Sequence, residues 1–163
     1  MEKLNKDIIR LFVSDVDSTY NDGIFTYNSE GLMELGRYYT QDSRGLGLLH
    51  KFKVCDTMLI TSTEERRSLQ LIADRIHINY LVEGCKNKLE YLERFLYNFK
   101  ISWNEVAYIG DDTNDKLCLE KAKFKACPNN SVREIKEIPN IYICPRNGGH
   151  GAIRDFIDHL ELF

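Results

Sequence analysis

Short apolar runs alternate with amphipathic stretches along most of the chain. Runs with the length and residue types of buried strands lie at residues 8–14, 57–61, 80–82, 106–110, 125–127 and 141–144. Stretches with the helical spacing of apolar residues lie at 43–52, 64–75, 86–99, 114–121, 131–138 and 151–160. Strands that alternate with helices predict right-handed crossovers and a parallel sheet. Because several strands read as continuous apolar runs, we expect helices on both faces of an α/β fold.

One stretch interrupts this alternation. Apolar residues at 23–27 and 32–39 flank the turn-like segment 28–31, a pattern that predicts a β-hairpin. The hairpin follows the first strand, so we expect it to stand over the edge of the sheet where that strand ends. No insertion is long enough for a separate lid, and residues 1–163 are expected to form a single domain. A neighbouring subunit is then the natural candidate for closing an open site.

Composition narrows the classes of protein. The 163 residues carry a net charge of -3, so no bulk basic field draws the chain to nucleic acid or to anionic lipid. No apolar run approaches the ~20 residues that span a bilayer, and the N-terminal residues lack the pattern of a secretory signal. The five cysteines include no C-x-x-C pair, which indicates reduced thiols and argues against structural zinc. We expect a cytoplasmic protein that binds neither nucleic acid nor membrane.

Two acidic clusters, far apart in the sequence, each follow a predicted strand. Asp15 and Asp17 come after the first strand, and Asp111, Asp112 and Asp115 come after the run 106–110. The carboxyl ends of parallel strands meet at one edge of the sheet, where ligands bind. Carboxylates gathered there would repel one another unless a hard cation lay among them. Mg²⁺ suits such a site, because it prefers oxygen ligands and often shares them with a substrate phosphate.

The first cluster has the chemistry for phosphoryl transfer. A carboxylate at Asp15 is a plausible nucleophile toward phosphorus, and Asp17, two positions on, could protonate the leaving oxygen and then activate water. One acid of the second cluster would complete the Mg²⁺ site with Asp15 and the main-chain carbonyl of Asp17. The others would orient ligands or hold Lys88. A solvated turn explains D-x-D alone, and a helix N-terminus explains Asp112 or Asp115 alone. Neither explains why the two clusters mirror each other.

Two further residues are candidates for holding phosphate. Ser62 ends an apolar run and opens a helix, where a hydroxyl and backbone N–H groups can cradle an anion. An ordinary N-cap serine is the alternative interpretation, and Thr61 is the alternative holder of the role. Lys88 lies near a helix N-terminus, where the dipole disfavours a cation, so a nearby anion would explain it. A solvated surface lysine is the alternative there, and Lys86 is the obvious competitor.

Taken in order, these elements resemble the four motifs of the haloacid dehalogenase superfamily: D-x-D, a strand-terminal hydroxyl, a lysine and G-D-D-x-x-D. The hairpin, the missing lid and the segment 148–154 resemble its capless branch. That branch includes 3-deoxy-D-manno-octulosonate 8-phosphate phosphatase and the nonulosonate (KDN, sialic acid) 9-phosphate phosphatases. The resemblance implies a Rossmann-like fold without a cap domain, a Mg²⁺ cofactor, and a homotetramer in which one subunit's hairpin region helps to close a neighbour's site.

The same resemblance implies a role for each motif residue. The implied catalytic residues are Asp15 as nucleophile, Asp17 as general acid/base, and Ser62 and Lys88 as phosphate holders. The implied metal ligands are Asp15, Asp17 and Asp111, with Asp112 and Asp115 in support. The implied substrate contacts are Thr40, Gln41, Asp42, Ser43 and Arg44, which match the family segment that contacts the sugar acid, together with Glu64.

The chain departs from the family pattern at two places. Glycine is usual where Ser18 stands, and a side chain there could crowd the turn, unless the turn has no need of positive φ. The octulosonate enzymes usually read I-T-G-R where this chain has Thr61-Ser62-Thr63-Glu64. Glu64 would repel a substrate carboxylate beside it but could accept hydrogen bonds from sugar hydroxyls. This difference favours a nine-carbon substrate.

We therefore expect a phosphoric monoester hydrolase that acts on a 2-keto-3-deoxy sugar acid, at the 8-phosphate of an octulosonate or the 9-phosphate of a nonulosonate. Two alternatives remain open. The chain could be a non-catalytic oligomerisation module, like the similar domain fused to some animal sialic-acid cytidylyltransferases. It could also be a sugar phosphatase of broad range.

Overall fold

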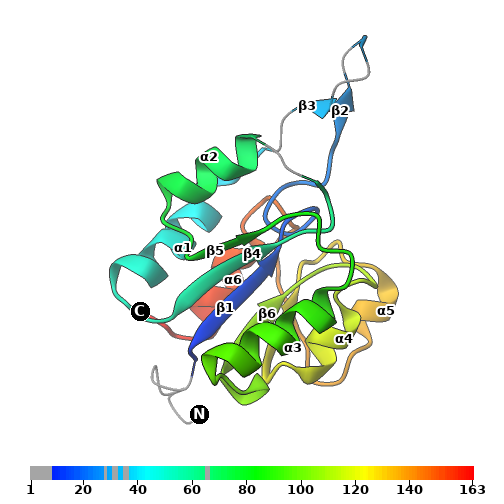
Figure 1. The fold of residues 1–163 in the computed structure, drawn as a ribbon. Coiled ribbons are helices and arrows are strands. Elements are labelled where there is room, and N and C mark those ends of the chain that lie inside the picture. The colour runs from blue at the N-terminus through cyan, green and yellow to red at the C-terminus, as the bar shows by residue number, and fades with distance from the viewer. Residues whose placement is uncertain (1–8, 28, 31–32, 35–36, 65–66) are drawn as a thin grey trace.

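The protein is described here from a computed structural model, which covers residues 9–27, 29–30, 33–34, 37–64 and 67–163. Its centre is a six-stranded parallel sheet with the order β5-β4-β1-β6-β7-β8 (Figure 1). The strands are β1 (Leu11–Asp15), β4 (Asp56–Ile60), β5 (Tyr80–Val82), β6 (Val106–Ile109), β7 (Phe124–Cys127) and β8 (Tyr142–Ile143). The prediction of a parallel α/β sheet is confirmed.

Helices cover both faces of the sheet. Successive side chains of a strand point to opposite faces, so these continuously apolar strands place apolar side chains on both. Phe12 of β1 packs in a core with apolar residues of α1, α2 and α6, whereas Leu11 and Val13 pack in a second core with α3, α4 and α5. These helices are α1 (Thr40–Lys51), α2 (Arg67–Arg75), α3 (Lys88–Phe99), α4 (Lys116–Lys121), α5 (Arg133–Lys136) and α6 (Ala152–His159), and a 3₁₀ turn, η2 (Trp103–Glu105), precedes β6. No helix formed by the described residues has the length and apolar character needed to cross a membrane.

The predicted hairpin is present. Its strands β2 (Thr26–Tyr27) and β3 (Met33–Glu34) pair antiparallel, and Figure 1 shows them standing away from the sheet. Residues 28 and 31 of the predicted turn lie outside the described residues. Among the described residues no cap domain is inserted between the sheet elements. The expectation of one domain over residues 1–163 stays a prediction.

The order of the strands brings the two acidic clusters together. β1 pairs with β6 so that Ser14 lies opposite Ile109, and the segments that follow both strands leave the sheet side by side. On its other side β1 pairs with β4, where Asp15 lies opposite Ile60. Three chain segments with candidate site residues therefore meet at the carboxyl edge of the sheet, as expected for a parallel α/β fold.

Candidate active site

A buried ion pair lies at the centre of this edge. Asp15 ends β1, Lys88 begins α3, and Lys88 Nζ lies 2.5 Å from Asp15 Oδ1. Burial raises the pKa of Asp15 well above its usual range, nearby Asp115 adds to this rise, and Lys88 opposes it. Lys88 is 2% exposed. Lys86 is exposed and donates to the Ser62 carbonyl at 2.8 Å, so Lys88 is the lysine that meets the carboxylates.

Asp115 holds Lys88 from the other side. Its Oδ1 accepts hydrogen bonds from Lys88 Nζ at 2.7 Å and from the Tyr108 hydroxyl at 2.6 Å. Its Oδ2 accepts from the backbone N–H groups of Asp111, at 3.2 Å, and Asp112, at 3.4 Å. Burial by itself would lower the pKa of Lys88, but the carboxylates of Asp15 and Asp115 raise it above its usual value. The lysine is therefore a fixed cation inside the protein.

The close approach of Asp115 to the strand end requires glycine at position 110. A Cβ atom on Gly110 would lie 2.4 Å from Asp115 Cγ. The glycine that begins the G-D-D-x-x-D motif thus leaves room for the carboxylate that anchors the lysine. This packing explains the first residue of the motif in steric terms.

Three buried carboxylates can share a cation. Asp15, Asp111 and Asp115 each offer an oxygen within 4.8 Å of the others. Thr19 Oγ1 donates to Asp111 Oδ1 at 3.2 Å, and burial, with Asp115 nearby, raises the pKa of Asp111 to about 6. A hard divalent cation would offset the repulsion, and carboxylate oxygens are ligands that Mg²⁺ prefers. The donor set fits Mg²⁺. Because both oxygens of Asp115 already accept hydrogen bonds, Asp15 and Asp111 are the carboxylates that would hold the ion.

Asp17 has a different environment from Asp15. It is partly buried and accepts from Asn21 Nδ2 at 3.0 Å, Thr61 Oγ1 at 3.0 Å and Thr63 Oγ1 at 2.9 Å. Thr61 follows β4 directly, and its hydroxyl faces the Asp17 carboxylate. The strand-terminal hydroxyl that the structure brings to the acid pair is therefore that of Thr61, the alternative to Ser62.

The predicted sugar-acid segment opens α1, three residues earlier than the sequence pattern indicated. Asp42 is fully buried and accepts from the backbone N–H groups of Gly151 at 2.9 Å and Arg154 at 2.8 Å. It thereby caps the start of α6. Burial raises the pKa of Asp42 to about 6, which these two bonds oppose. A substrate contact by Asp42 stays a prediction, and its observed contacts are structural.

The other members of this segment face different surroundings. Ser43 Oγ pairs with the Tyr20 hydroxyl at 2.8 Å, and Gln41 Oε1 accepts from Arg146 Nη1 at 2.6 Å. A hollow of about 450 Å³ is lined by Thr40, Gln41, Arg44, Arg146, Arg154 and Asp158. Glu64 is exposed. Three of the predicted substrate contacts thus border an open, arginine-lined hollow.

The sequence did not decide whether the turn after β1 needs a positive φ at Ser18, and the structure shows that it does. Ser18 has φ +61°, so the turn does use the left-handed region where glycine is usual. A Cβ on Gly148 would lie 1.6 Å from the Ser18 carbonyl oxygen, and Gly149 N donates to the Thr19 carbonyl at 3.0 Å. The C-terminal glycine segment therefore packs directly on the loop that carries Asp17.

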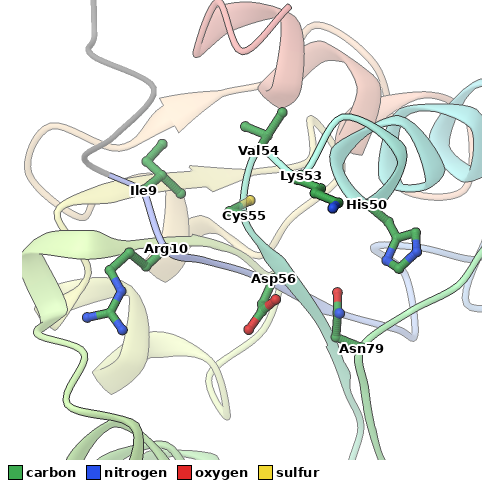
Figure 2. A pocket seen from close by; sticks show the side chains of 8 residues that line it. All are labelled: Ile9, Arg10, His50, Lys53, Val54, Cys55, Asp56 and Asn79. Atoms are coloured by element: carbon green, nitrogen blue, oxygen red, sulfur yellow. The ribbon is translucent and has the colours of Figure 1, made fainter.

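A second hollow lies at the opposite edge of the sheet. It measures about 540 Å³, and Figure 2 shows it among Arg10, Cys55, Asp56 and Asn79, near the starts of β1 and β4. None of the residues that line it belongs to the acid clusters described above. Since ligands of parallel α/β sheets bind beyond the carboxyl ends of the strands, we place the candidate site at the other edge.

Comparison with known families identifies this arrangement. Residues 59–157 match the model of the haloacid dehalogenase-like hydrolases. The chain belongs to this hydrolase family. The predicted superfamily is thereby confirmed.

Two kinds of curated relative cover nearly all of the chain. It is 30% identical over 158 residues to 3-deoxy-D-manno-octulosonate 8-phosphate phosphatase of Escherichia coli, covering 94% of this chain and 80% of that protein. It is 29% identical over 156 residues to N-acylneuraminate cytidylyltransferase A of Danio rerio, covering 96% of this chain. The chain spans only 36% of the length of that cytidylyltransferase.

Solved structures confirm the predicted fold. The structure of 3-deoxy-D-manno-octulosonate 8-phosphate phosphatase from Moraxella catarrhalis, in complex with magnesium, phosphate and KDO, is 29% identical with a TM-score of 0.86. The match covers 95% of this chain and 87% of that one. A probable YrbI family phosphatase from Pseudomonas syringae is 26% identical with a TM-score of 0.88, over 95% and 86% of the two chains. Relatives named as phosphatases support the predicted phosphoric monoester hydrolase.

Proposed function

We propose that this chain is a Mg²⁺-dependent phosphatase that removes the terminal phosphate of a 2-keto-3-deoxy sugar acid. The main observation behind the proposal is the buried cluster in which Asp15 contacts Lys88 and lies close enough to Asp111 to share a metal ion with it. A nucleophilic carboxylate, a fixed cation and a site for a hard metal ion are the parts that phosphoryl transfer needs. The Escherichia coli and Moraxella catarrhalis relatives, named as phosphatases, support it.

In the proposed reaction, the Asp15 carboxylate attacks phosphorus and the bond to the sugar oxygen breaks, with its electron pair passing to that oxygen. Asp17 gives its proton to the departing oxygen. Asp17 then takes a proton from water, whose oxygen attacks the aspartyl phosphate and frees Asp15. Lys88 offsets phosphoryl charge as a point charge. Mg²⁺, held by Asp15, Asp111 and the main-chain carbonyl of Asp17, would supply further charge stabilisation.

We propose Thr61 as the hydroxyl that holds the phosphate, with Ser62 as the alternative. Thr61 is 1% exposed, directly follows β4, and its hydroxyl lies 3.0 Å from the Asp17 carboxylate. A phosphate attacked by Asp15 has to lie close to this position, because Asp15 lies opposite Ile60, the residue before Thr61. Replacing Thr61 by Val should weaken substrate binding more than replacing Ser62 by Ala.

We propose that the sugar acid lies toward the start of α1. The hollow there carries Arg44, Arg146 and Arg154, and guanidinium groups pair well with carboxylates. Thr40 and Gln41 on its rim could bond sugar hydroxyls. The names of the phosphatase relatives favour an octulosonate 8-phosphate, whereas exposed Glu64 favours a nonulosonate 9-phosphate, so both belong in the substrate panel.

We propose a homotetramer in which the hairpin closes a neighbour's site. Ile24, Phe25 and Tyr27 on and beside β2 are 56%, 40% and 63% exposed, and Figure 1 shows the hairpin projecting from the sheet. Large apolar side chains on a projecting element favour burial against another surface. A cytoplasmic location stays a prediction.

A second candidate function is a non-catalytic oligomerisation module. The likeness to the Danio rerio cytidylyltransferase, of which this chain matches 36%, is the observation in its favour. The buried cluster of Lys88, Asp15 and Asp115 argues against this function. Burying these charges lowers stability, and a purely structural module would gain nothing from them.

The test is phosphate release from a panel of esters by the full chain, with Mg²⁺ and again with a chelator. The panel holds 3-deoxy-D-manno-octulosonate 8-phosphate, a nonulosonate 9-phosphate, unrelated sugar phosphates and 4-nitrophenyl phosphate. The proposal predicts Mg²⁺-dependent turnover and the highest kcat/KM on one sugar acid. No release from any ester would favour the oligomerisation module, and similar kcat/KM on unrelated sugars would favour a broad-range phosphatase.

A further inference from the structure

Neutral hydrogen-bond donors hold both oxygens of the Asp17 carboxyl group. Asn21 Nδ2 donates to Oδ1 at 3.0 Å. Thr61 Oγ1 and Thr63 Oγ1 both donate to Oδ2, at 3.0 Å and 2.9 Å. We call these three side chains the Asp17 clamp. With a donor on each side, rotation of the carboxyl group would break at least one bond.

The amide of Asn21 has only one orientation that fits its surroundings. Its Oδ1 accepts from Ser18 N at 3.2 Å and Gly23 N at 2.8 Å, so its Nδ2 is directed to Asp17. Because an amide oxygen accepts and an amide nitrogen donates, a flip would lose both backbone bonds and the bond to Asp17. Asn21 is 2% exposed, so water would not replace them.

Thr63 is fixed by the neighbouring loop. Its carbonyl accepts from Gly84 N at 2.8 Å, and its own N–H donates to Thr61 Oγ1 at 3.1 Å. The Thr61 carbonyl accepts from Cys85 N at 2.9 Å. The two hydroxyls therefore sit on a short segment that is tied to the residues leading into Lys88. Such supporting bonds keep a functional group within the narrow range of positions that catalysis needs.

We propose that Thr63 and Asn21 are positioning residues that aim the Asp17 carboxyl group at the oxygen of the leaving sugar. This inference rests on the proposed phosphatase function and concerns the same site. If Thr61 turns its hydroxyl to the bound phosphate, Thr63 and Asn21 still hold both oxygens of Asp17. When Asp17 gives up its proton to the leaving oxygen, it becomes a carboxylate, and hydrogen bonds to an ionised acceptor are the stronger ones. The clamp then stabilises the transition state more than the resting acid, which is how a hydrogen bond accelerates a reaction.

The test compares two leaving groups in Thr63→Val, which keeps the shape of the side chain and removes the hydroxyl. A sugar alkoxide needs a proton to leave, whereas 4-nitrophenolate leaves without one. The experiment measures kcat/KM. This ratio reports the steps up to release of the alcohol and does not include hydrolysis of the aspartyl phosphate. We expect kcat/KM to fall about tenfold on the better sugar acid phosphate of the panel, a part of the full effect of a general acid. On 4-nitrophenyl phosphate the fall should stay within about twofold, because that reaction does not use the acid.

Controls separate positioning from general damage. The ratio of the two kcat/KM values, measured on one preparation, does not depend on the fraction of folded protein. Thr63→Ser should restore the wild-type ratio, and Thr63→Ala should reproduce the ratio of the Val variant if Val folds poorly. Thr113→Val, which removes an exposed hydroxyl at the same edge of the sheet, should leave the ratio unchanged.

Two results would overturn the inference. Equal losses on both esters, or an undiminished rate on the sugar acid phosphate, would show that Thr63 does not act through the acid. Wild-type protein that cleaves neither ester would refute the proposed function itself, and the inference would fall with it.

Discussion

The two halves of the candidate site use opposite means to hold a carboxylate. Around Asp15 the protein buries full charges, with Lys88 against Asp15 and Asp115. Around Asp17 it places neutral donors and leaves the group partly exposed. A nucleophile must be ionised and ready, and a lysine and a metal ion favour that state. A general acid must give up and regain a proton without moving away from its target, and the hydroxyl and amide donors on both oxygens of Asp17 hold it in place. Two carboxylates one residue apart thus have environments suited to different tasks.

Among the substitutions that test this difference between Asp15 and Asp17, we expect Asp15→Asn to have the largest effect on activity. The amide is not a nucleophile toward phosphorus, so we expect kcat on 4-nitrophenyl phosphate to fall by about a thousandfold or more. Phosphate release with Mg²⁺ measures it. Asp56→Asn, an exposed residue at the amino edge, is the control and should keep wild-type activity. Substantial turnover by Asp15→Asn would show that another residue is the nucleophile.

Next in size is the loss of the buried cation. Lys88→Met leaves the carboxylates of Asp15 and Asp115 buried without a compensating cation, which should cost on the order of 3 kcal/mol of unfolding free energy. Urea denaturation in the presence of a chelator measures it, so that no metal compensates. Lys86→Met, two residues earlier and exposed, should change stability by less than about 0.5 kcal/mol. Equal effects of the two substitutions would mean that Lys88 does not compensate the charge of the buried carboxylates.

A smaller effect concerns metal removal and pH. The pKa of Asp111 is raised from 3.8 to about 6 by burial and by Asp115. Between these values the folded state binds more protons than the unfolded state, so without metal this group makes stability fall as pH rises from about 4 to 6. The loss is on the order of 3 kcal/mol and persists at pH 7.

Mg²⁺ binds the ionised carboxylates, so its stabilising effect should grow over the same pH range. Thermal melts at pH 4, 5, 6 and 7, with Mg²⁺ and with a chelator, measure the difference. Asp111→Asn in chelator should lose part of the pH dependence. A Mg²⁺ effect that stays constant from pH 4 to 7 would contradict this account of the cluster.

The smallest expected effect is a change in stability at Ser18, in the loop that carries Asp17. Ser18 has φ +61°, a region that costs a side chain about 1 kcal/mol relative to glycine. Ser18→Gly should therefore stabilise the protein by up to about 1 kcal/mol. Ser68→Gly, within α2, should destabilise it by a similar amount. Chemical denaturation measures both, and a loss of stability in Ser18→Gly would show that the hydroxyl contributes more than the strain costs.

The sequence predicted the surroundings of Asp15 better than the surroundings of Asp17. Acids placed after apolar strands must meet at one edge of a parallel sheet, so Asp15, Asp111 and Asp115 could be brought together without coordinates. Tyr108 was missed because it lies within an apolar run and reads as a core residue. Asn21 and Thr63 were missed because short polar residues in loops are common, and their aim depends on backbone bonds between distant segments.

Small shifts in element boundaries account for other differences. The first long helix was expected at residue 43 but begins at Thr40. Asp42 therefore lies in its first turn, where it points to the backbone of α6 rather than to solvent. The strand ends were predicted closely at β4, β5 and β6 because apolar runs end sharply there.

The central claim is that Asp15 becomes phosphorylated during turnover while Asp17 serves both steps as acid and base. The most direct measurement uses Asp17→Asn with 4-nitrophenyl phosphate and Mg²⁺, since this variant can form the aspartyl phosphate but hydrolyses it slowly. The reaction is quenched and treated with borohydride, which reduces an acyl phosphate to an alcohol, and the residue is located by mass spectrometry. We predict a burst of nitrophenol matched by homoserine at position 15. A burst with modification at another residue, or with no covalent modification, would contradict the account.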